Sequence, residues 1–209
     1  MAQIKLQPPG KIIAVGLNYR SHAAELNMAV PEEPVLFMKP PSAVIAAGEA
    51  IVLPPSSAQV DYEAELAVVI GKTARGVGVD EAAAYVLGYT CANDVTARDL
   101  QKLDGQWTRS KSFDTFCPLG PWVESVAPAP DSLVELVLNG EVRQSAPVSD
   151  MIFSPLELVA FISGVMTLEA GDVILTGTPP GVGALTAGDE VTVRVDGIGE
   201  LVSNVVTPA

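Results

Sequence analysis

The segment 62–71, YEAELAVVIG, limits the possible folds more than any other part of the chain. Its second half is an unbroken apolar run, which predicts a strand buried on both faces of its sheet. Such a strand needs a chain with enough length and apolar residues to cover both faces. The chain has 209 residues, of which 48% are hydrophobic, and this suits one domain with a sizeable core.

Most of the other patterned segments are also typical of strands. The 18 glycines and 17 prolines imply many turns, which favours a sheet-rich fold over a helix bundle. Strands are expected in segments 11–16, 32–40, 172–183, 190–195 and 200–206, and in a hairpin at 133–144 with an Asn139-Gly140 type I′ turn. The expected helices are a turn from Asn18 or Ser21, a helix over 81–89 capped by Asp80, and one with a Ser154-Pro155-Leu156-Glu157 capping box. These elements predict an α+β fold with a large mixed sheet.

The charge and the cysteines exclude several classes of function. Acidic residues outnumber basic ones, 25 to 12, and the formal net charge of −13 disfavours binding to nucleic acids and to anionic membranes. The chain has no apolar run of about 18 residues and no signal-peptide pattern at its start. Cys91 and Cys117 form no metal or disulfide pattern and are expected to be buried. We therefore expect a cytoplasmic protein with a small-molecule partner.

Two glutamates at the start of the apolar strand indicate a cation site. Glu63 and Glu65 are two residues apart, so in a strand they share one face, which Asp61 can join. Neighbouring carboxylates repel each other, and a strand that enters an apolar core is an unfavourable place for them. A bound cation resolves this conflict. The alternative is an edge strand whose acidic face meets water.

A third carboxylate, Asp94, follows the apolar segment 86–92 and precedes the segment 95–101. At a strand-to-helix junction it can act as a metal ligand or as a helix cap. Three carboxylates without nearby His or Cys form a hard oxygen site. The sequence therefore predicts Mg²⁺ or Mn²⁺ as the cofactor and disfavours zinc.

The chain contains a single histidine, His22, with Glu25 three residues later. On a helix these side chains share one face, so Glu25 can hold the imidazole in one tautomer and raise its basicity. Such a pair can activate water as a general base. A surface histidine beside a solvated glutamate is the alternative.

Lys111 lies in the segment TRSKSFDTF, near Trp107, Phe113 and Phe116. A lysine in apolar surroundings can neutralise a substrate carboxylate or an enolate. A lysine on the surface is the alternative, and the sequence leaves both open.

Two further segments offer substrate contacts. Arg98 and Gln101 share a face of the expected helix and can donate hydrogen bonds. Glycines in segment 176–183, TGTPPGVG, allow backbone N–H groups to approach an anion, although a plain turn fits as well. This segment lacks the Gly-Lys-Ser/Thr ending of a P-loop, and Gly76-Val77-Gly78 lacks the third glycine of a dinucleotide site.

The order of these segments resembles the fumarylacetoacetate hydrolase superfamily. The resemblance covers about residues 11 to 205 in the blocks GLNYRSHAAEL, EEPVLFMKP, DYEAELAVVIGK, NDVTARDLQ, SKSFDTFCPLGP, GEVRQ, MIFSP and ILTGTPPGVG. It implies a large mixed, mostly β roll with a few short helices, and a homodimer. It also implies a single catalytic domain over residues 1–209, with about 1–10 as a lead-in strand or tail.

The resemblance also implies roles for individual residues. The metal ligands of the family fall on Glu63, Glu65 and Asp94. The catalytic lysine falls on Lys111, and the dyad of a lid falls on His22 and Glu25. The substrate-binding positions fall on Arg98, Gln101, Gly177 and Thr178.

The implied substrate is a small 2-oxo acid with a second carbonyl group. A metal-chelated enolate of this acid would allow C–C cleavage, by acylpyruvate hydrolysis or by oxaloacetate decarboxylation. His22 would activate water, and the segment from His22 to about Pro34 would close as a lid. The blocks also resemble isomerases and decarboxylases of aromatic catabolism, so 2-hydroxyhepta-2,4-diene-1,7-dioate (5-carboxymethyl-2-hydroxymuconate) isomerase is the alternative. A non-catalytic metal-binding relative is a lesser one.

Overall fold

Residues 8–208 of the chain are described by a computed structural model, so most of the expected N-terminal lead-in, residues 1–7, lies outside the described residues. The strand expected within 62–71 is β6, Ala64–Ile70, and all of its residues are buried. β6 is the central strand of a seven-stranded sheet. Alternate residues of β6 belong to hydrophobic clusters on opposite faces of that sheet, as the unbroken apolar run predicts.

The seven-stranded sheet is mixed and curls into a roll. In order, its strands are β2 (Val35–Lys39), β1 (Ile12–Gly16), β12 (Val173–Leu175), β6 (Ala64–Ile70), β7 (Val86–Asn93), β9 (Cys117–Glu124) and β3 (Val44–Ile45). β1 is parallel to β12, β3 is parallel to β9, and the other neighbours are antiparallel. The edge strands β2 and β3 are separated only by Pro40 and the short 3₁₀ helix η1 (Pro41–Ala43), which brings the two edges of the sheet together. One face of this sheet carries the smaller of the two clusters of buried side chains, which includes Ala14 and Ala67.

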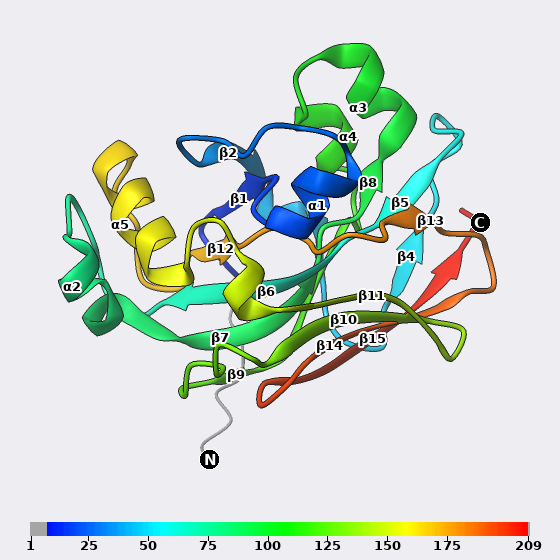
Figure 1. Ribbon diagram of the computed structural model, residues 1–209. Coiled ribbons are helices and arrows are strands. Elements are labelled where there is room, and N and C mark those ends of the chain that lie inside the picture. The colour runs from blue at the N-terminus through cyan, green and yellow to red at the C-terminus, as the bar shows by residue number, and fades with distance from the viewer. Residues whose placement is uncertain (1–7, 209) are drawn as a thin grey trace.

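A second sheet packs against the first on the face opposite these alanines (Figure 1). In order, its strands are β11 (Glu141–Pro147), β10 (Leu133–Leu138), β14 (Glu190–Val195), β15 (Gly199–Val206) and β4 (Ala50–Val52). Val134, Leu136 and Val193 from this sheet join Leu66 and Val68 of β6 in the main core. Full burial of one such side chain stabilises the fold by about 1.5–3 kcal/mol, so this interface holds β6 firmly in place.

A small three-stranded sheet lies at the start of β6. In order, its strands are β13 (Gly183–Ala184), β5 (Val60–Tyr62) and β8 (Thr96–Ala97). β5 leads directly into Glu63, β8 follows Asp94, and β13 ends the glycine-rich segment 176–183. The sheet therefore holds three segments with predicted site residues beside one another.

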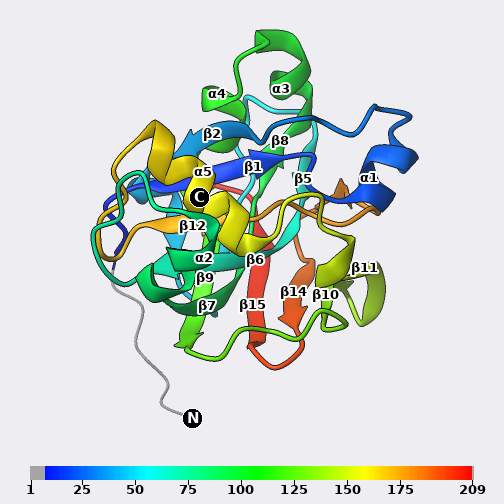
Figure 2. The same cartoon turned by 60° about the vertical axis from the view of Figure 1, so that its left-hand side comes forward.

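The helices are short and lie in separate places around the sheets (Figures 1 and 2). α5 (Pro155–Val165) packs against α2 (Val79–Ala82), while α3 (Arg98–Asp104) packs against α4 (Thr108–Lys111). The remaining helical elements are α1 (Arg20–Glu25), η2 (Ala83–Tyr85) and η3 (Val148–Asp150). Within residues 8–208, no helix is both long and apolar enough to cross a membrane.

The architecture confirms the predicted α+β fold, a large mixed, mostly β roll with a few short helices. The hairpin turn has positive φ angles at Asn139 (51°) and Gly140 (83°), as a type I′ turn requires. The capping box is present, because the Ser154 and Glu157 side chains accept hydrogen bonds from each other's backbone N–H groups. Both cysteines are buried.

The predicted helix over residues 81–89 is wrong. α2 ends at Ala82, a single 3₁₀ turn follows, and the next segment is strand β7. The residue at the N-cap is Gly78, and Asp80 lies inside the first turn. β7 pairs with β6 along its length, and this ladder overrides the helix propensity of the alanines before it.

Candidate functional site

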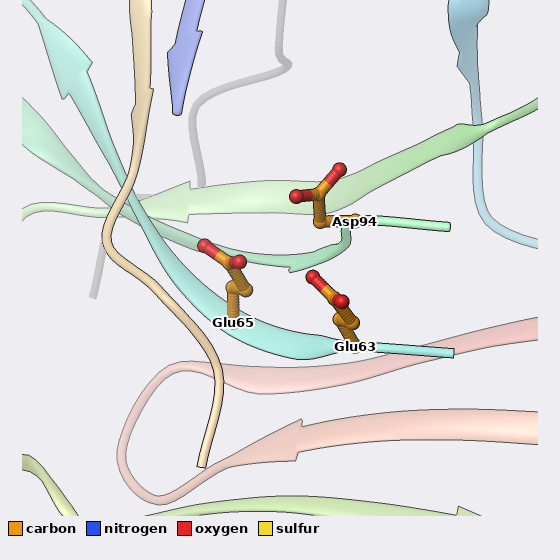
Figure 3. A group of neighbouring side chains, drawn as sticks. All are labelled: Glu63, Glu65 and Asp94. Atoms are coloured by element: carbon orange, nitrogen blue, oxygen red, sulfur yellow. The ribbon is translucent and has the colours of Figure 1, made fainter. Parts of the chain in front are cut away.

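The carboxylates of Glu63, Glu65 and Asp94 meet at the start of β6 (Figure 3). Glu63 lies between β5 and β6, Glu65 lies on β6, and Asp94 follows β7 directly. One oxygen from each carboxylate lies within 4.8 Å of the other two. All three residues are buried, which rules out an edge strand whose acidic face meets water.

Two hydrogen bonds, one of them to the Asn93 side chain, hold Glu63 next to Asp94. The Glu63 N–H donates to Asn93 Oδ1 at 3.0 Å, and the Asp94 N–H donates to the Glu63 carbonyl at 2.8 Å. Sequence reasoning gave Asn93 no function. Asn93 ends an apolar strand and directly precedes Asp94, a candidate metal ligand. This position is the sequence signal that could have indicated its structural role.

Two buried lysines bind Asp94. Lys111, at the end of α4, places Nζ 2.5 Å from Asp94 Oδ2 and 2.8 Å from Glu63 Oε2. Lys39, at the end of β2, places Nζ 2.6 Å from Asp94 Oδ1. Lys111 is not on the surface, and its Nζ lies 4.9 Å from the centroid of the Phe37 ring, a neighbour that the sequence did not predict.

Lys39 is a charged site residue that sequence reasoning missed. It is the last residue of the apolar strand VLFMK, and only 1% of its surface is exposed. A lysine that ends an apolar strand before a proline gives a signal for a buried, paired cation. This signal is weaker than the spacing of the two glutamates.

The two glutamates differ in their electrostatic environment. Burial acts to raise the pKa of Glu63, but Lys111 and Arg98 outweigh it and lower this pKa to about 2. The pKa of Glu65 is raised well above its ordinary value by burial and by the charges of Asp94 and Glu63. The hydrogen bond found at the Glu65 carboxylate comes from the N–H of Gly177, at 2.6 Å. Glu65 is therefore a buried acid whose ionised form requires an additional positive charge.

Arg98 and Gln101 occupy one face of α3, as predicted. Arg98 Nε donates to Asp61 Oδ2 at 2.8 Å, one terminal nitrogen donates to Glu63 Oε1 at 2.5 Å, and the other donates to Gln101 Oε1 at 2.7 Å. Burial acts to lower the pKa of the guanidinium, but the charge of Glu63 and the hydrogen bonds that Arg98 donates to Asp61 and Glu63 raise it. Arg98 therefore stays charged and balances two acids beside the cavity.

The predicted pair of His22 and Glu25 is formed on α1. His22 Nδ1 lies 2.9 Å from Glu25 Oε2, and His22 is 8% exposed. The same carboxylate accepts a hydrogen bond from the N–H of Gly181, at 3.1 Å. These contacts are inconsistent with an isolated surface histidine, and they leave Nε2 as the other ring nitrogen for acid–base chemistry.

The glycine-rich segment 176–183 connects the carboxylate cluster to this pair. At one end Gly177 binds Glu65, and near the other end Gly181 binds Glu25. Thr178 Oγ1 donates to the carbonyl of Ala64 at 2.9 Å, so its hydroxyl lies next to β6. The segment is therefore not a plain turn, because its backbone N–H groups and hydroxyl are bound to the site.

Gln144, on β11, holds the middle of this segment. Its Nε2 donates to Thr178 Oγ1 at 2.8 Å and to the Pro179 carbonyl at 2.7 Å, while its Oε1 accepts from the Ala64 N–H at 2.9 Å. Gln144 is 1% exposed. The sequence analysis placed Gln144 in the block GEVRQ but gave it no role. Only the fold shows that this polar residue of the hairpin is buried.

All predicted site residues except Glu25 and Gly177 line one cavity of about 200 Å³, and those two hydrogen-bond to residues that do. The polar part of its lining consists of the three carboxylates, Lys111, Arg98, Gln101, Thr178 and His22. The rest of the wall is apolar and comes from Val15, Leu17, Leu26, Met28, Phe37 and Trp107. A cavity of this size accommodates a small organic acid.

Several known proteins are similar to this chain over most of its length. The solved structure of 5-carboxymethyl-2-hydroxymuconate delta-isomerase from Mycobacterium smegmatis is 47% identical, has a TM-score of 0.91, and matches 97% of this chain and 80% of its own. Fumarylpyruvate hydrolase from Pseudomonas aeruginosa, solved with Mn²⁺ and pyruvate, is 32% identical with a TM-score of 0.91, over 99% of this chain and 96% of its own. The mitochondrial oxaloacetate tautomerase Fahd2a of Rattus norvegicus is 43% identical over 95% of this chain and 67% of its own.

A family model agrees with these similarities. The model described as fumarylacetoacetate (FAA) hydrolase C-terminal matches residues 11–206, nearly the whole chain. The resemblance found in the ordered sequence blocks is thus confirmed at the level of the superfamily. This chain belongs to the fumarylacetoacetate hydrolase superfamily.

Proposed function

We propose that this protein is a divalent-metal-dependent enzyme that acts on a small 2-oxo acid through its enolate, and that its main reaction is hydrolysis of an acylpyruvate. One observation carries the proposal. A single cavity brings three buried carboxylates together with the one histidine of the chain, and this histidine is paired with Glu25. A hard-cation site beside a general base is a combination suited to hydrolysis.

The residues in the cavity fit Mg²⁺ or Mn²⁺. Glu63, Glu65 and Asp94 would hold the ion, since they offer only oxygen ligands, and among residues 8–208 no basic side chain forms an ion pair with Glu65. When bound, the ion supplies Lewis acidity that stabilises negative charge developing on the oxygen of the 2-oxo group.

The remaining polar residues bind and orient the substrate. Gly177 and Thr178, which donate to Glu65 and to the Ala64 carbonyl, position this part of the site. Lys111 and Arg98 supply positive charge next to the carboxylates, and the side-chain amide N–H groups of Gln101 add hydrogen-bond donors. Such donors stabilise a developing oxyanion most effectively in a buried site.

His22 performs the proton transfer in this proposal. Glu25 holds Nδ1, so Nε2 takes a proton from the water that attacks the C4 carbonyl of the acylpyruvate. The C3–C4 bond then breaks, C4 leaves as a carboxylic acid, and C3 receives a proton to give pyruvate. A positioned general base of this kind contributes about 10²–10⁴-fold to the rate.

Proton transfer without bond cleavage is the second candidate function. Two similar proteins are named as an isomerase and as an oxaloacetate tautomerase. Both reactions use the enolate of a 2-oxo acid and an acid–base residue, so the same cavity and His22 suit them. Decarboxylation of oxaloacetate also passes through the enolate, but it requires no attacking water.

Parallel assays distinguish these reactions. Acetylpyruvate, oxaloacetate and a hydroxymuconate-type dienoate are each tested with Mg²⁺, with Mn²⁺ and with excess chelator, and both keto–enol exchange and product formation are followed. Metal-dependent formation of acetate and pyruvate supports the proposal. Turnover of the dienoate alone, or exchange without cleavage, favours the second candidate, and activity undiminished by chelator contradicts the metal-dependent scheme.

We also propose that the enzyme works as a homodimer in the cytoplasm, with a small molecule rather than a nucleic acid or a membrane as its partner. Support for a dimer comes from the edge strand β2, where Val35 and Met38 are 47% and 45% exposed. Light scattering of the purified chain measures its mass in solution. A monomer at all concentrations would contradict the dimer.

A further inference from the structure

The cavity has two chemically different parts. Its polar part surrounds the three carboxylates, whereas the rest of its lining is built mainly from apolar side chains. Among these, Leu26 and Met28 are 47% and 55% exposed, although both are large hydrophobic residues. Exposed apolar side chains that line a cavity are stabilised when an apolar ligand covers them.

Trp107 is built into the apolar wall. Its ring packs edge-on against Phe37, with the ring centroids 5.1 Å apart. It also lies directly over Gly16, where an added Cβ atom would come within 2.8 Å of the indole. The absence of a side chain at Gly16 therefore makes room for the large indole of Trp107, which lines the cavity. A smaller residue at position 107 would not require glycine at position 16.

The basic groups of the cavity are already committed to acids. Within the described residues, its lining contains Arg98, Lys111 and His22 as groups that can carry positive charge. Arg98 binds Asp61 and Glu63, and Lys111 binds Glu63 and Asp94. His22 is paired with Glu25. No lining cation in residues 8–208 remains for a second substrate carboxylate at the apolar wall.

The charges of the site lead to the same conclusion. Apart from the His22–Glu25 pair, the carboxylate cluster and its ion-pair partners are four acids and three cations, namely Asp61, Glu63, Glu65, Asp94, Lys39, Arg98 and Lys111. They leave one negative charge, which a divalent cation and one substrate carboxylate would bring to zero. A second carboxylate would add an uncompensated charge next to apolar side chains, which is strongly unfavourable.

We propose that the apolar wall formed by Leu26, Met28, Phe37 and Trp107 binds an uncharged tail, so that the substrate is a monocarboxylic 2-oxo acid with an alkyl or aryl end. Trp107 is the main specificity-determining residue of this wall. The inference rests on the proposed function, because the proposed metal site sets which end of the substrate faces the wall. It separates this chain from relatives whose names refer to substrates with two or more carboxylates.

Binding of three stable 2-oxo acids tests this inference without relying on turnover. Pyruvate has no tail, 5-methyl-2-oxohexanoate carries an isopropyl end, and 2-oxoglutarate carries a carboxylate of nearly the same shape in that place. The protein has two tryptophans, and Trp122 lies outside the cavity lining. A Trp122→Phe protein therefore reports binding through the fluorescence of Trp107, which is measured with Mn²⁺ or Mg²⁺ and with chelator.

The inference predicts that 5-methyl-2-oxohexanoate binds at least about tenfold more tightly than pyruvate, while 2-oxoglutarate binds no more tightly than pyruvate. Tighter binding of 2-oxoglutarate than of its isopropyl analogue would overturn the inference but leave the proposed function standing. Metal-dependent binding by none of the three acids would overturn the proposed function and the inference together.

Two variants at Trp107 assign the effect to this residue, with calorimetry as the readout. In Trp107→Ala the advantage of the isopropyl ligand over pyruvate should fall to less than about threefold, while the affinity for pyruvate stays within about twofold. Trp107→Phe keeps an apolar ring and should retain most of the advantage. An unchanged advantage in Trp107→Ala would refute the role of Trp107.

Discussion

Replacing Lys39 by methionine removes one of the two lysines that bind Asp94. Methionine fills a similar volume, so the main effect is electrostatic. Lys39 Nζ contacts Asp94 Oδ1 at 2.6 Å and the Val95 carbonyl at 3.2 Å, and its side chain has no solvent exposure. Breaking a buried ion pair by removing one partner is destabilising by about 3–5 kcal/mol. Because Asp94 keeps its contact with Lys111, we expect a value near the lower end, about 3 kcal/mol, for the metal-free protein.

Urea denaturation, followed by circular dichroism in the presence of chelator, measures this loss in the free energy of unfolding. Lys102→Met is the matched control, because Lys102 is exposed on α3 and its replacement should change stability by no more than about 0.5 kcal/mol. In the double variant Lys39→Met/Asp94→Asn the uncompensated carboxylate is gone, so the loss should be smaller than the sum of the single losses. A change below about 1 kcal/mol for Lys39→Met would refute the reasoning.

Three further variants test the catalytic pair and the glycine-rich segment. His22→Ala should reduce acylpyruvate hydrolysis by about 10²–10⁴-fold and impair decarboxylation less, and equal losses in parallel rate assays would contradict its role in activating water. Gln144→Ala removes three buried hydrogen bonds and should lower stability by about 2–4 kcal/mol in urea titrations, so a near-neutral result would count against its anchoring role. Gly181→Ala places a Cβ atom 2.2 Å from the Arg143 carbonyl oxygen at a residue whose φ is +93°, so it should destabilise the protein by more than about 1 kcal/mol in thermal melts. Gly76→Ala is the milder control in the same melts, because no atom lies within 4 Å of the added Cβ atom.

Most strands could be predicted from the sequence, because the local residue pattern favours the same structure as the pairing between strands. The unbroken apolar run of β6 predicts burial on both faces, and Asn139-Gly140 predicts the hairpin turn. At residues 86–89 the signals conflict, since the preceding alanines favour a helix while the β6 ladder requires a strand. Only the pairing with β6 resolves this conflict, and pairing between distant segments is not visible in local sequence.

The candidate site was predictable to the extent that its residues are neighbours in sequence. Glu63 and Glu65 were predicted as a pair because they are two residues apart, and His22 and Glu25 because they are three apart. Lys39 and Gln144 gave no such signal, because their partners lie 34 to 80 residues away. The curling of the sheet and the docking of β11 bring these residues to the site.

Metal binding by the carboxylate cluster is the most direct test of the account. Isothermal titration of the chelator-treated protein with Mn²⁺ should give about one site per chain. Glu65→Gln should abolish this binding, because within the described part of the chain Glu65 is the carboxylate of the three that has no ion-pair partner. Glu124→Gln alters a buried acid on β9 outside the cavity and should retain it. No binding by the unaltered protein, or equal binding by Glu65→Gln, would contradict the assignment of this cluster as the metal site.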